Sequence, residues 1–277
     1  MNQNSYLNLL FYYLSDQTRV IITVYTAATY YIKEYFQHAK EVYKKRNEVI
    51  HLDLNRISEI WVYDKRLYIG DLSDITIREI NLEKIIKDKN LIDEFCDELN
   101  NIFNYTYLPI DCDVIFLDQA IKRFFKREEE EKELFSNIIN EFYAYKVLVK
   151  LHPSVNTVPD KYDQFNVQVI KENKVPWEVI LMNEVKNNNL KNKIFVSYYS
   201  ETLFTTHIFL KHLNIPHEAL HLKGLLEDHI TINKEIGEPM FDRFIENFKK
   251  VYAHNFHDLK SFHELRNTLN NLIKPNS

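Results

Sequence analysis

The sequence predicts an α/β protein whose larger part is built around a parallel β-sheet. From about Asp113 onward, short apolar runs alternate with segments of helical periodicity. That alternation is typical of consecutive right-handed βαβ units, which place successive strands in parallel. The 277 residues are 45% hydrophobic and 14% aromatic, which supplies the apolar side chains that one large core or two modest cores require.

Five segments of this larger part are expected to form strands. The run 114–117 is continuously apolar, as in a strand buried on both faces of a sheet. Proline at the start and a serine N-cap indicate helices that begin near Pro176 and Ser200. The other predicted strands are 147–151, 167–170, 194–197 and 218–222, and the other predicted helices are 124–143, 239–252 and 259–272.

The first 108 residues are less regular. They contain a helix or helix–strand segment at 20–43, strand-like runs at 59–63 and 68–69, and a helical stretch at 82–103. We place the domain boundary near residues 107–109. The chain is therefore expected to contain a partial N-terminal domain, 1–108, and a C-terminal domain, 109–277.

Composition excludes several classes of function. A net charge of −5 and a pI near 6.1 give no general attraction for nucleic acid. The three glycines do not form a glycine-rich phosphate loop. Cys96 and Cys112 lack a CxxC spacing, which argues against a disulfide scaffold or zinc cluster and favours a reducing, cytoplasmic setting. No apolar run approaches the length of a membrane span, so at most peripheral association, at the inner face of the cell membrane, is expected.

Histidines are frequent in the C-terminal third, but their spacing predicts no metal site. Neither HExxH nor a paired Cys/His pattern occurs there. Solvated or capping side chains are the simpler interpretation. The residues are His207, His212, His217, His221, His229, His254, His257 and His263.

A cation and a titratable imidazole follow one of the predicted strands. Lys150 is the next-to-last residue of the run 147–151, and His152 and Pro153 come directly after that run. Because side chains alternate with a period of two along a strand, we expect Lys150 and His152 on the same side. An ammonium and an imidazole at the carboxyl end of a parallel strand suit an anionic group, and a phosphate in particular.

Two further loops of the same sheet carry polar residues suited to a nucleotide. Ser197 and Ser200 follow the strand 194–197, and Ser200 offers a hydroxyl and free backbone amides at a helix start. Glu178 follows Pro176 and Trp177, and its carboxylate can accept hydrogen bonds from a ribose. Taken singly, each has an ordinary structural interpretation, such as an N-cap or a helix-start acid. Their convergence at one sheet edge favours a nucleotide site.

These motifs resemble those of bacterial sialyltransferases of glycosyltransferase family 52. The resemblance rests on Lys150-Leu151-His152-Pro153, on the Pro-aromatic-Glu pattern ending at Glu178, and on the serines at 197 and 200, and it covers roughly residues 113–222. It implies a GT-B-like glycosyltransferase. The intact part would be a C-terminal, Rossmann-like domain that binds the nucleotide sugar, and the N-terminal part would be reduced, largely helical and on the acceptor side.

The resemblance also implies roles for individual residues. His152 would contact the phosphate of CMP-sialic acid and act as general acid for the departing CMP. Lys150 and Pro153 would belong to the same phosphate site, the two serines would hydrogen-bond the phosphate, and Glu178 would hold the ribose. The reaction would be an inverting displacement onto a surface glycan of lipooligosaccharide or capsule, with no metal and no other cofactor.

Asp118, directly after the strand 114–117, is the candidate base for the acceptor hydroxyl. The family also carries an acidic-acidic-glycine motif in its N-terminal domain, and this sequence lacks it. We therefore expect the chain to begin inside the first domain, as a fragment or divergent member.

Two alternatives stay open: another envelope-polymer glycosyl- or glycerophosphotransferase, and a non-catalytic nucleotide-binding module. The expected partners are a nucleotide-sugar donor and a glycan acceptor, and a homodimer is allowed.

Overall fold

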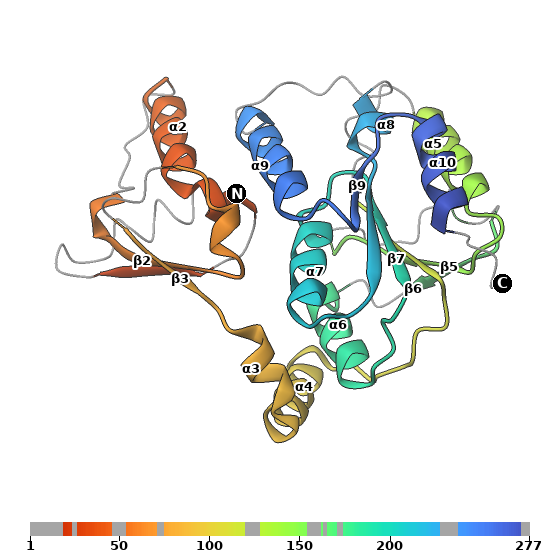
Figure 1. Ribbon diagram of the computed structural model, residues 1–277, viewed down its shortest axis with the longest axis horizontal. Coiled ribbons are helices and arrows are strands. Elements are labelled where there is room, and N and C mark those ends of the chain that lie inside the picture. The colour runs from red at the N-terminus through yellow and green to blue at the C-terminus, as the bar shows by residue number, and fades with distance from the viewer. Residues whose placement is uncertain are drawn as a thin grey trace. The chain divides into compact units, whose positions relative to one another are not determined.

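The computed structural model describes residues 19–23, 27–45, 54–70, 75–119, 128–153, 162, 165–170, 174–227 and 238–272. The chain forms two α/β units, each with its own parallel sheet (Figure 1). Unit 1 comprises residues 1–81 and 234–251, and unit 2 comprises 82–233 and 252–277. This grouping differs from the expected division at residue 108. No helix in the described ranges combines the length and apolar character that a membrane span needs.

Unit 2 contains a six-stranded, wholly parallel sheet, which confirms the predicted α/β class. The strands lie in the order β6-β5-β4-β7-β8-β9. Counted along the chain, this is the order 3-2-1-4-5-6 of a Rossmann fold. The strands are β4 (Val114–Leu117), β5 (Val147–Lys150), β6 (Val167–Ile170), β7 (Lys193–Ser197), β8 (His217–His221) and β9 (Phe256–Asp258).

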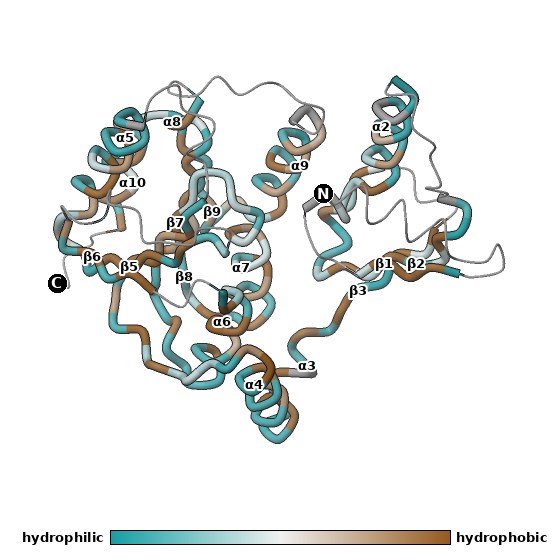
Figure 2. Tube along the Cα trace, turned by 180° about the vertical axis from the view of Figure 1, so that it is seen from behind, coloured by the Kyte–Doolittle hydropathy of each residue, from teal (hydrophilic) through white to brown (hydrophobic). Residues whose placement is uncertain are grey.

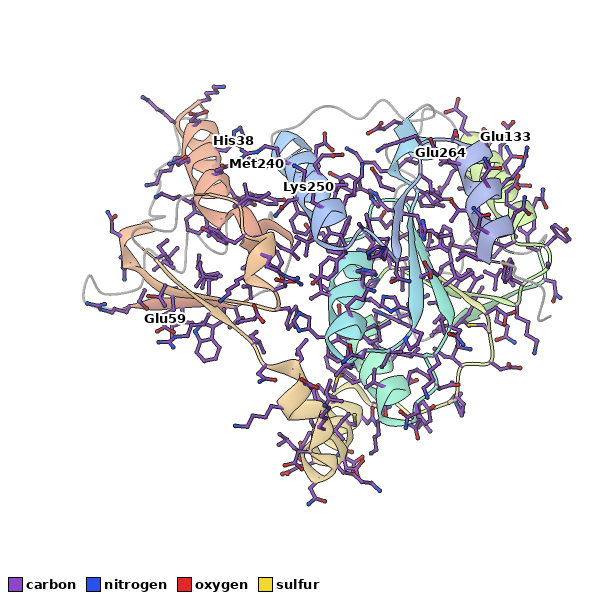
Figure 3. The ribbon with its side chains drawn as sticks, in the orientation of Figure 1. His38, Glu59, Glu133, Met240, Lys250 and Glu264 are labelled. Carbon is purple, nitrogen blue, oxygen red and sulfur yellow. The ribbon has the colours of Figure 1, made fainter. Side chains whose placement is uncertain are left out.

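Helices cover both faces of this sheet, with α5 and α10 on one side and α6 and α7 on the other (Figures 1 and 2). Phe116 of β4 packs edge-on against Phe135 of α5 at 5.6 Å between ring centroids, and Phe195 of β7 packs against Trp177 of α6 at 6.1 Å. Glu133 on α5 and Glu264 on α10 are exposed, at the outer surface of the unit (Figure 3). These helices are α5 (Glu128–Glu141), α6 (Trp177–Lys186), α7 (Glu201–His212) and α10 (Phe262–Leu272).

The segment expected as one helix at 82–103 is two helices, α3 (Leu82–Lys87) and α4 (Lys89–Phe103). Asp88 separates them because it is the N-cap of α4. Its carboxylate accepts hydrogen bonds from the backbone N–H groups of Asn90 and Leu91. A short helix, α8 (Lys223–Glu227), follows β8.

Unit 1 has a three-stranded parallel sheet in the order β1-β2-β3. The segment 20–43 contains a strand followed by a helix, which is one of the two expected alternatives, whereas residues 68–69 do not form a strand. Glu59 of β2, labelled in Figure 3, pairs with Arg78 of β3 at 2.8 Å and accepts a hydrogen bond from the Trp61 indole. The elements are β1 (Val20–Thr23), β2 (Ile57–Val62), β3 (Thr76–Glu79), α2 (Ile32–Lys45) and α9 (Glu238–Val251).

The helix expected to close the C-terminal domain, α9, belongs to unit 1. Phe244 stacks on Tyr30 at 5.5 Å, and Arg243 pairs with Glu34 of α2 at 2.8 Å. Tyr30 is 1% exposed, so its ring serves aromatic packing in this unit. The amphipathic pattern of residues 239–252 predicted the helix correctly, while the surface on which it packs comes from the other end of the chain.

Two of the C-terminal histidines form a buried pair between α7 and β8. The Nε2 of His217 lies 2.9 Å from the Nδ1 of His207, and the Nδ1 of His217 lies 2.8 Å from the Ile215 carbonyl oxygen. Burial lowers the pKa of His217 to about 4 and that of His207 well below its ordinary value. Both imidazoles are therefore neutral at pH 7 and act as packing groups.

This pair predicts a loss of stability in acid. The unfolded chain binds protons on these histidines from pH 6.5 downward, whereas folded His217 resists protonation until about pH 4. The pair's contribution to the free energy of unfolding is thus fully present above pH 6.5 and is lost as the pH falls towards 4. We expect His217 alone to account for a decrease of about 2 kcal/mol between pH 7 and 4.5, measured by urea denaturation. His217→Gln, which cannot be protonated, should flatten the profile, and an unchanged slope would contradict this account.

Candidate functional site

The centre of the larger sheet contains a topological switch point. The chain runs from β4 to β5 on one side and from β7 to β8 on the other, so β4 and β7 are neighbours whose following loops separate. In open α/β sheets, ligands bind outside the carboxyl ends of the strands at this point. The predicted residues Asp118, Lys150, Ser197 and Ser200 all lie at or just beyond the carboxyl ends of β4, β5 and β7.

Two hydrogen bonds tie the ends of β4 and β7 together. The Ser197 hydroxyl donates to the Leu117 carbonyl oxygen at 2.8 Å. The backbone N–H of Tyr199 donates to the Oε1 of Gln119 at 2.6 Å. The first residues of both loops are therefore held in a fixed relation, which is the preorganisation that a binding site at a switch point needs.

Asp118 is buried at this edge, with 4% of its surface exposed. Its backbone N–H donates to the Lys150 carbonyl oxygen at 3.0 Å, and its carboxylate accepts a hydrogen bond from the Tyr162 hydroxyl. Burial, reinforced by the Asp118 charge, raises the pKa of Tyr162 far above its ordinary value. The phenol therefore stays protonated and remains a donor to this carboxylate.

Lys150 is also buried, with 3% of its surface exposed, and its Nζ donates to the Leu151 carbonyl oxygen at 2.9 Å. Strand β5 ends at Lys150, so His152 lies beyond the part of the chain in which strand alternation applies. His152 and Pro153 are exposed. The expected same-side arrangement of Lys150 and His152 thus does not follow from the strand. A buried ammonium with an exposed imidazole two residues later is what the fold provides.

The two serines have different local roles. Ser197 is fully buried, and its hydroxyl proton is used in the bond to Leu117. Ser200 is the N-cap of α7, where its Oγ accepts a hydrogen bond from the Thr202 N–H at 3.2 Å, as its sequence position predicted. The amide groups of the first turn of α7 lie next to this cap, at the same edge as Lys150.

Glu178 lies in the first turn of α6 and is exposed. The hydrogen bonds and ion pairs of the described residues connect it to none of the other predicted site residues. Its neighbour Trp177 is buried, and the indole N–H donates to the Thr206 hydroxyl at 2.8 Å. Trp177 is therefore a core aromatic residue.

A buried His–Asp pair, absent from the predicted site, lies at the ends of β8 and β9. The Nδ1 of His221 lies 2.9 Å from the Oδ1 of Asp258, and both side chains are fully buried. Burial lowers the pKa of His221, and the hydrogen bond that its imidazole donates to the Asp258 carboxylate offsets this lowering only in part. Burial alone would raise the pKa of Asp258, but its contacts with His221 and Lys260 outweigh burial and lower it. A neutral imidazole thus donates to a carboxylate, and this bond fixes the ends of both strands.

Sequence reasoning also missed Gln119, Tyr162 and Lys223. Lys223 is 4% exposed and comes two residues after β8, so it could have been found by the rule that selected Lys150, which is position at the carboxyl end of a predicted strand. Tyr162 had no signal, because its pairing with Asp118 joins residues 44 positions apart. In the described part of the chain, no group of three or more His, Cys, Asp or Glu residues is arranged to hold a metal ion.

No protein-family model and no curated protein sequence matches this chain. Several solved structures are similar to it, among them two variants of one polymerase and one transferase. A variant of the wall teichoic acid polymerase TagF has 16% identity and a TM-score of 0.40, over 78% of this chain and 49% of that one. A second TagF variant, soaked with CDPG, has 14% identity and a TM-score of 0.34, over 94% and 63%. KpsC of Thermosulfurimonas dismutans, a β-Kdo 2,7 transferase, has 14% identity and a TM-score of 0.27, over 73% and 78%. The chain spans about half the length of the first of these.

The Asp118–Tyr162 contact predicts a specific loss of stability. Tyr162→Phe removes the buried donor and leaves the carboxylate without it, which should lower the free energy of unfolding by about 1–3 kcal/mol in urea denaturation. In the background of Asp118→Asn the same substitution should cost less, because the charge is gone. Tyr143→Phe is the matched control, since Tyr143 is 90% exposed. Equal effects of the two tyrosine substitutions would contradict the assigned contact.

Proposed function

We propose that unit 2 binds a nucleotide-activated donor and that the protein is a transferase of the glycosyltransferase type that modifies an envelope glycan. The observation that carries the proposal is the position of Lys150 and His152. A buried ammonium and an exposed imidazole follow β5, which lies beside the switch point of a sheet with Rossmann strand order. Loops of neighbouring strands there are tied by the bonds of Ser197 and Tyr199.

The chemistry of these groups suits release of a nucleotide. Lys150 can stabilise the negative charge that develops on a departing phosphate, and His152 can give it a proton near neutral pH. The cap and first-turn amides at Ser200 add donors for the same phosphate. Asp118 is the proposed base for the acceptor hydroxyl, and Tyr162 holds its carboxylate in place. Glu178, on the exposed start of α6, is the proposed contact to the ribose.

CMP-sialic acid is the donor that we favour, on the motif resemblance, with inverting transfer to a lipooligosaccharide or capsule glycan. A cytoplasmic location and independence from metal belong to the same proposal. The second candidate is transfer of another sugar or of glycerol phosphate, since the same groups would serve any donor that leaves as a nucleotide. A non-catalytic binding module is the third, and it is motivated by the missing acidic-acidic-glycine motif.

Calorimetric titration of the full chain with CMP, CMP-sialic acid, CDP-glycerol and a UDP-sugar tests the donor site. His152→Ala should weaken binding of the preferred nucleotide at least tenfold, which corresponds to about 1.4 kcal/mol, because a charge-assisted contact to phosphate is lost. Lys150→Met, which keeps the length of the buried stem, should weaken it to a similar degree.

Lys146→Met is the matched control for the lysine substitution. Lys146 lies just before β5, at the opposite end of the strand from the site, and pairs with Asp111 on the surface at 2.9 Å. Its variant should bind like the wild type. If no nucleotide binds, or if His152→Ala binds normally, the proposal is wrong. Binding without release of nucleotide in the presence of glycan acceptors would favour the non-catalytic module.

A further inference from the structure

A second buried cation flanks the switch point on the side opposite Lys150. Lys223 follows β8 and is 4% exposed. Its ammonium lies 5.6 Å from the centre of the Tyr199 ring, within the range of a cation–π contact. Tyr199 belongs to the loop after β7, and its N–H is bonded to Gln119 after β4. The ammonium is therefore directed from β8 towards the switch point.

The backbone around Lys223 is rigidly held. The Leu222 N–H donates to the Ser197 carbonyl oxygen at 2.8 Å, which ties the end of β8 to the end of β7. At Gly224, a Cβ atom would lie 2.6 Å from the Cα of Lys260, so the chain approaches the β9 loop too closely for any other residue. The position of Lys223 relative to both loops is thus fixed by the fold.

Glu227, an ion-pair partner of Lys223, is much more accessible than Lys223 itself. Its Nζ lies 3.2 Å from the Oε1 of Glu227, whose side chain is 48% exposed, while the Lys223 side chain is 5% exposed. Burying an ammonium costs several kcal/mol unless opposite charge compensates it. A half-exposed carboxylate can move into water at little cost, so an incoming anion can replace it beside the ammonium.

The two lysines hold their ammonium groups in different halves of the edge. β5, β4, β7 and β8 are consecutive neighbours, so the ends of β5 and β8 are three strand spacings apart, or about 14 Å. The Lys150 ammonium donates to the Leu151 carbonyl oxygen beside β5, whereas the Lys223 ammonium lies over the Tyr199 ring and beside Glu227. A phosphate bound beside Lys150 therefore does not reach Lys223, which can contact a second anionic group.

We propose that Lys223 binds a second anionic group of the donor, either a second phosphate or a carboxylate on the transferred sugar. This inference rests on the proposed function, because it takes the nucleotide phosphate to lie at Lys150 and His152. It divides donor recognition into two anion subsites on the two flanks of the switch point, with Tyr199 between them.

Titration of the full chain with CMP, CDP and CMP-sialic acid separates the two subsites. We expect CDP, CMP-sialic acid or both to bind at least about tenfold more tightly than CMP, in line with one added charge-assisted contact. A preference for CDP identifies a second phosphate, and a preference for CMP-sialic acid identifies a carboxylate. Lys223→Gln should abolish the preference and leave the affinity for CMP within about twofold, and Lys223→Arg should retain it.

Two further variants sharpen the test. Glu227→Gln removes the competing carboxylate and should increase the preference for the ligand that carries a second anionic group. Lys260→Gln is the matched control, because Lys260 lies at the same edge beyond β9 and its charge is committed to Asp258 at 2.8 Å. If CMP binds in a His152-dependent manner but Lys223→Gln leaves the preference unchanged, only this inference fails. If no nucleotide binds, the proposed function fails as well.

Discussion

Helices on both faces of the larger sheet restrict where its polar side chains can lie. Each residue of β4 and β5 is buried, so a charged group in the middle of these strands would have neither water nor a backbone partner. Strand ends are different, because loops bring carbonyl groups, amides and helix starts within reach. Lys150, Ser197, His221 and Asp258 are all the last residues of their strands, and Asp118 lies one residue beyond. The chemistry of unit 2 is thus concentrated at one edge by the cost of burying charge elsewhere.

The buried charges at this edge are compensated in ways that also fix geometry. The Asp118 carboxylate accepts from Tyr162, and the Asp258 carboxylate accepts from His221. Removing one partner of such a pair costs more than the pair contributes, which makes these contacts strong constraints on position. Together with the bonds at Ser197 and Tyr199, they produce an edge whose polar groups need little reorganisation to receive an anion.

The sequence predicted the larger sheet well because its strands are continuous apolar runs. Five strands agree with expectation to within about one residue at either end, whereas β9 was missed because Phe256–Asp258 has only one apolar residue. In unit 1 the sequence did not separate the strand Val20–Thr23, whose residues alternate in exposure, from the helix that follows, because both lie in one long run of β-branched and aromatic residues. The packing of α9 with α2 could not be predicted, since an amphipathic pattern defines a buried face and not the surface that covers it.

The same limit applies to the site. Position after a strand predicted Asp118, Lys150, Ser197 and Ser200, because strand ends are local properties of the sequence. The partners that hold them come from distant segments, as Tyr162 does for Asp118 and Asp258 for His221, and no local pattern encodes such pairs. Glu178 lies at a helix start, as predicted, and its side chain is exposed, so its contact with a ribose stays a prediction.

Strand alternation separates these groups into two rows at the edge. Asp118 belongs with Phe116 to the row that faces α5, where Tyr162 packs edge-on against Phe135 at 4.9 Å. Ser197 and His221 are paired in register and belong to the opposite row, where His221 packs against Phe204 of α7 at 5.2 Å. Lys150 alternates with Val149, which faces the α5 core, and so shares the row of Ser197.

The proposed base and the proposed phosphate-binding cation therefore approach the switch point from opposite faces of the sheet. In an inverting displacement the acceptor hydroxyl and the leaving phosphate also lie on opposite sides of the reacting carbon. For the proposed reaction, the pleat of the parallel sheet would supply that opposition.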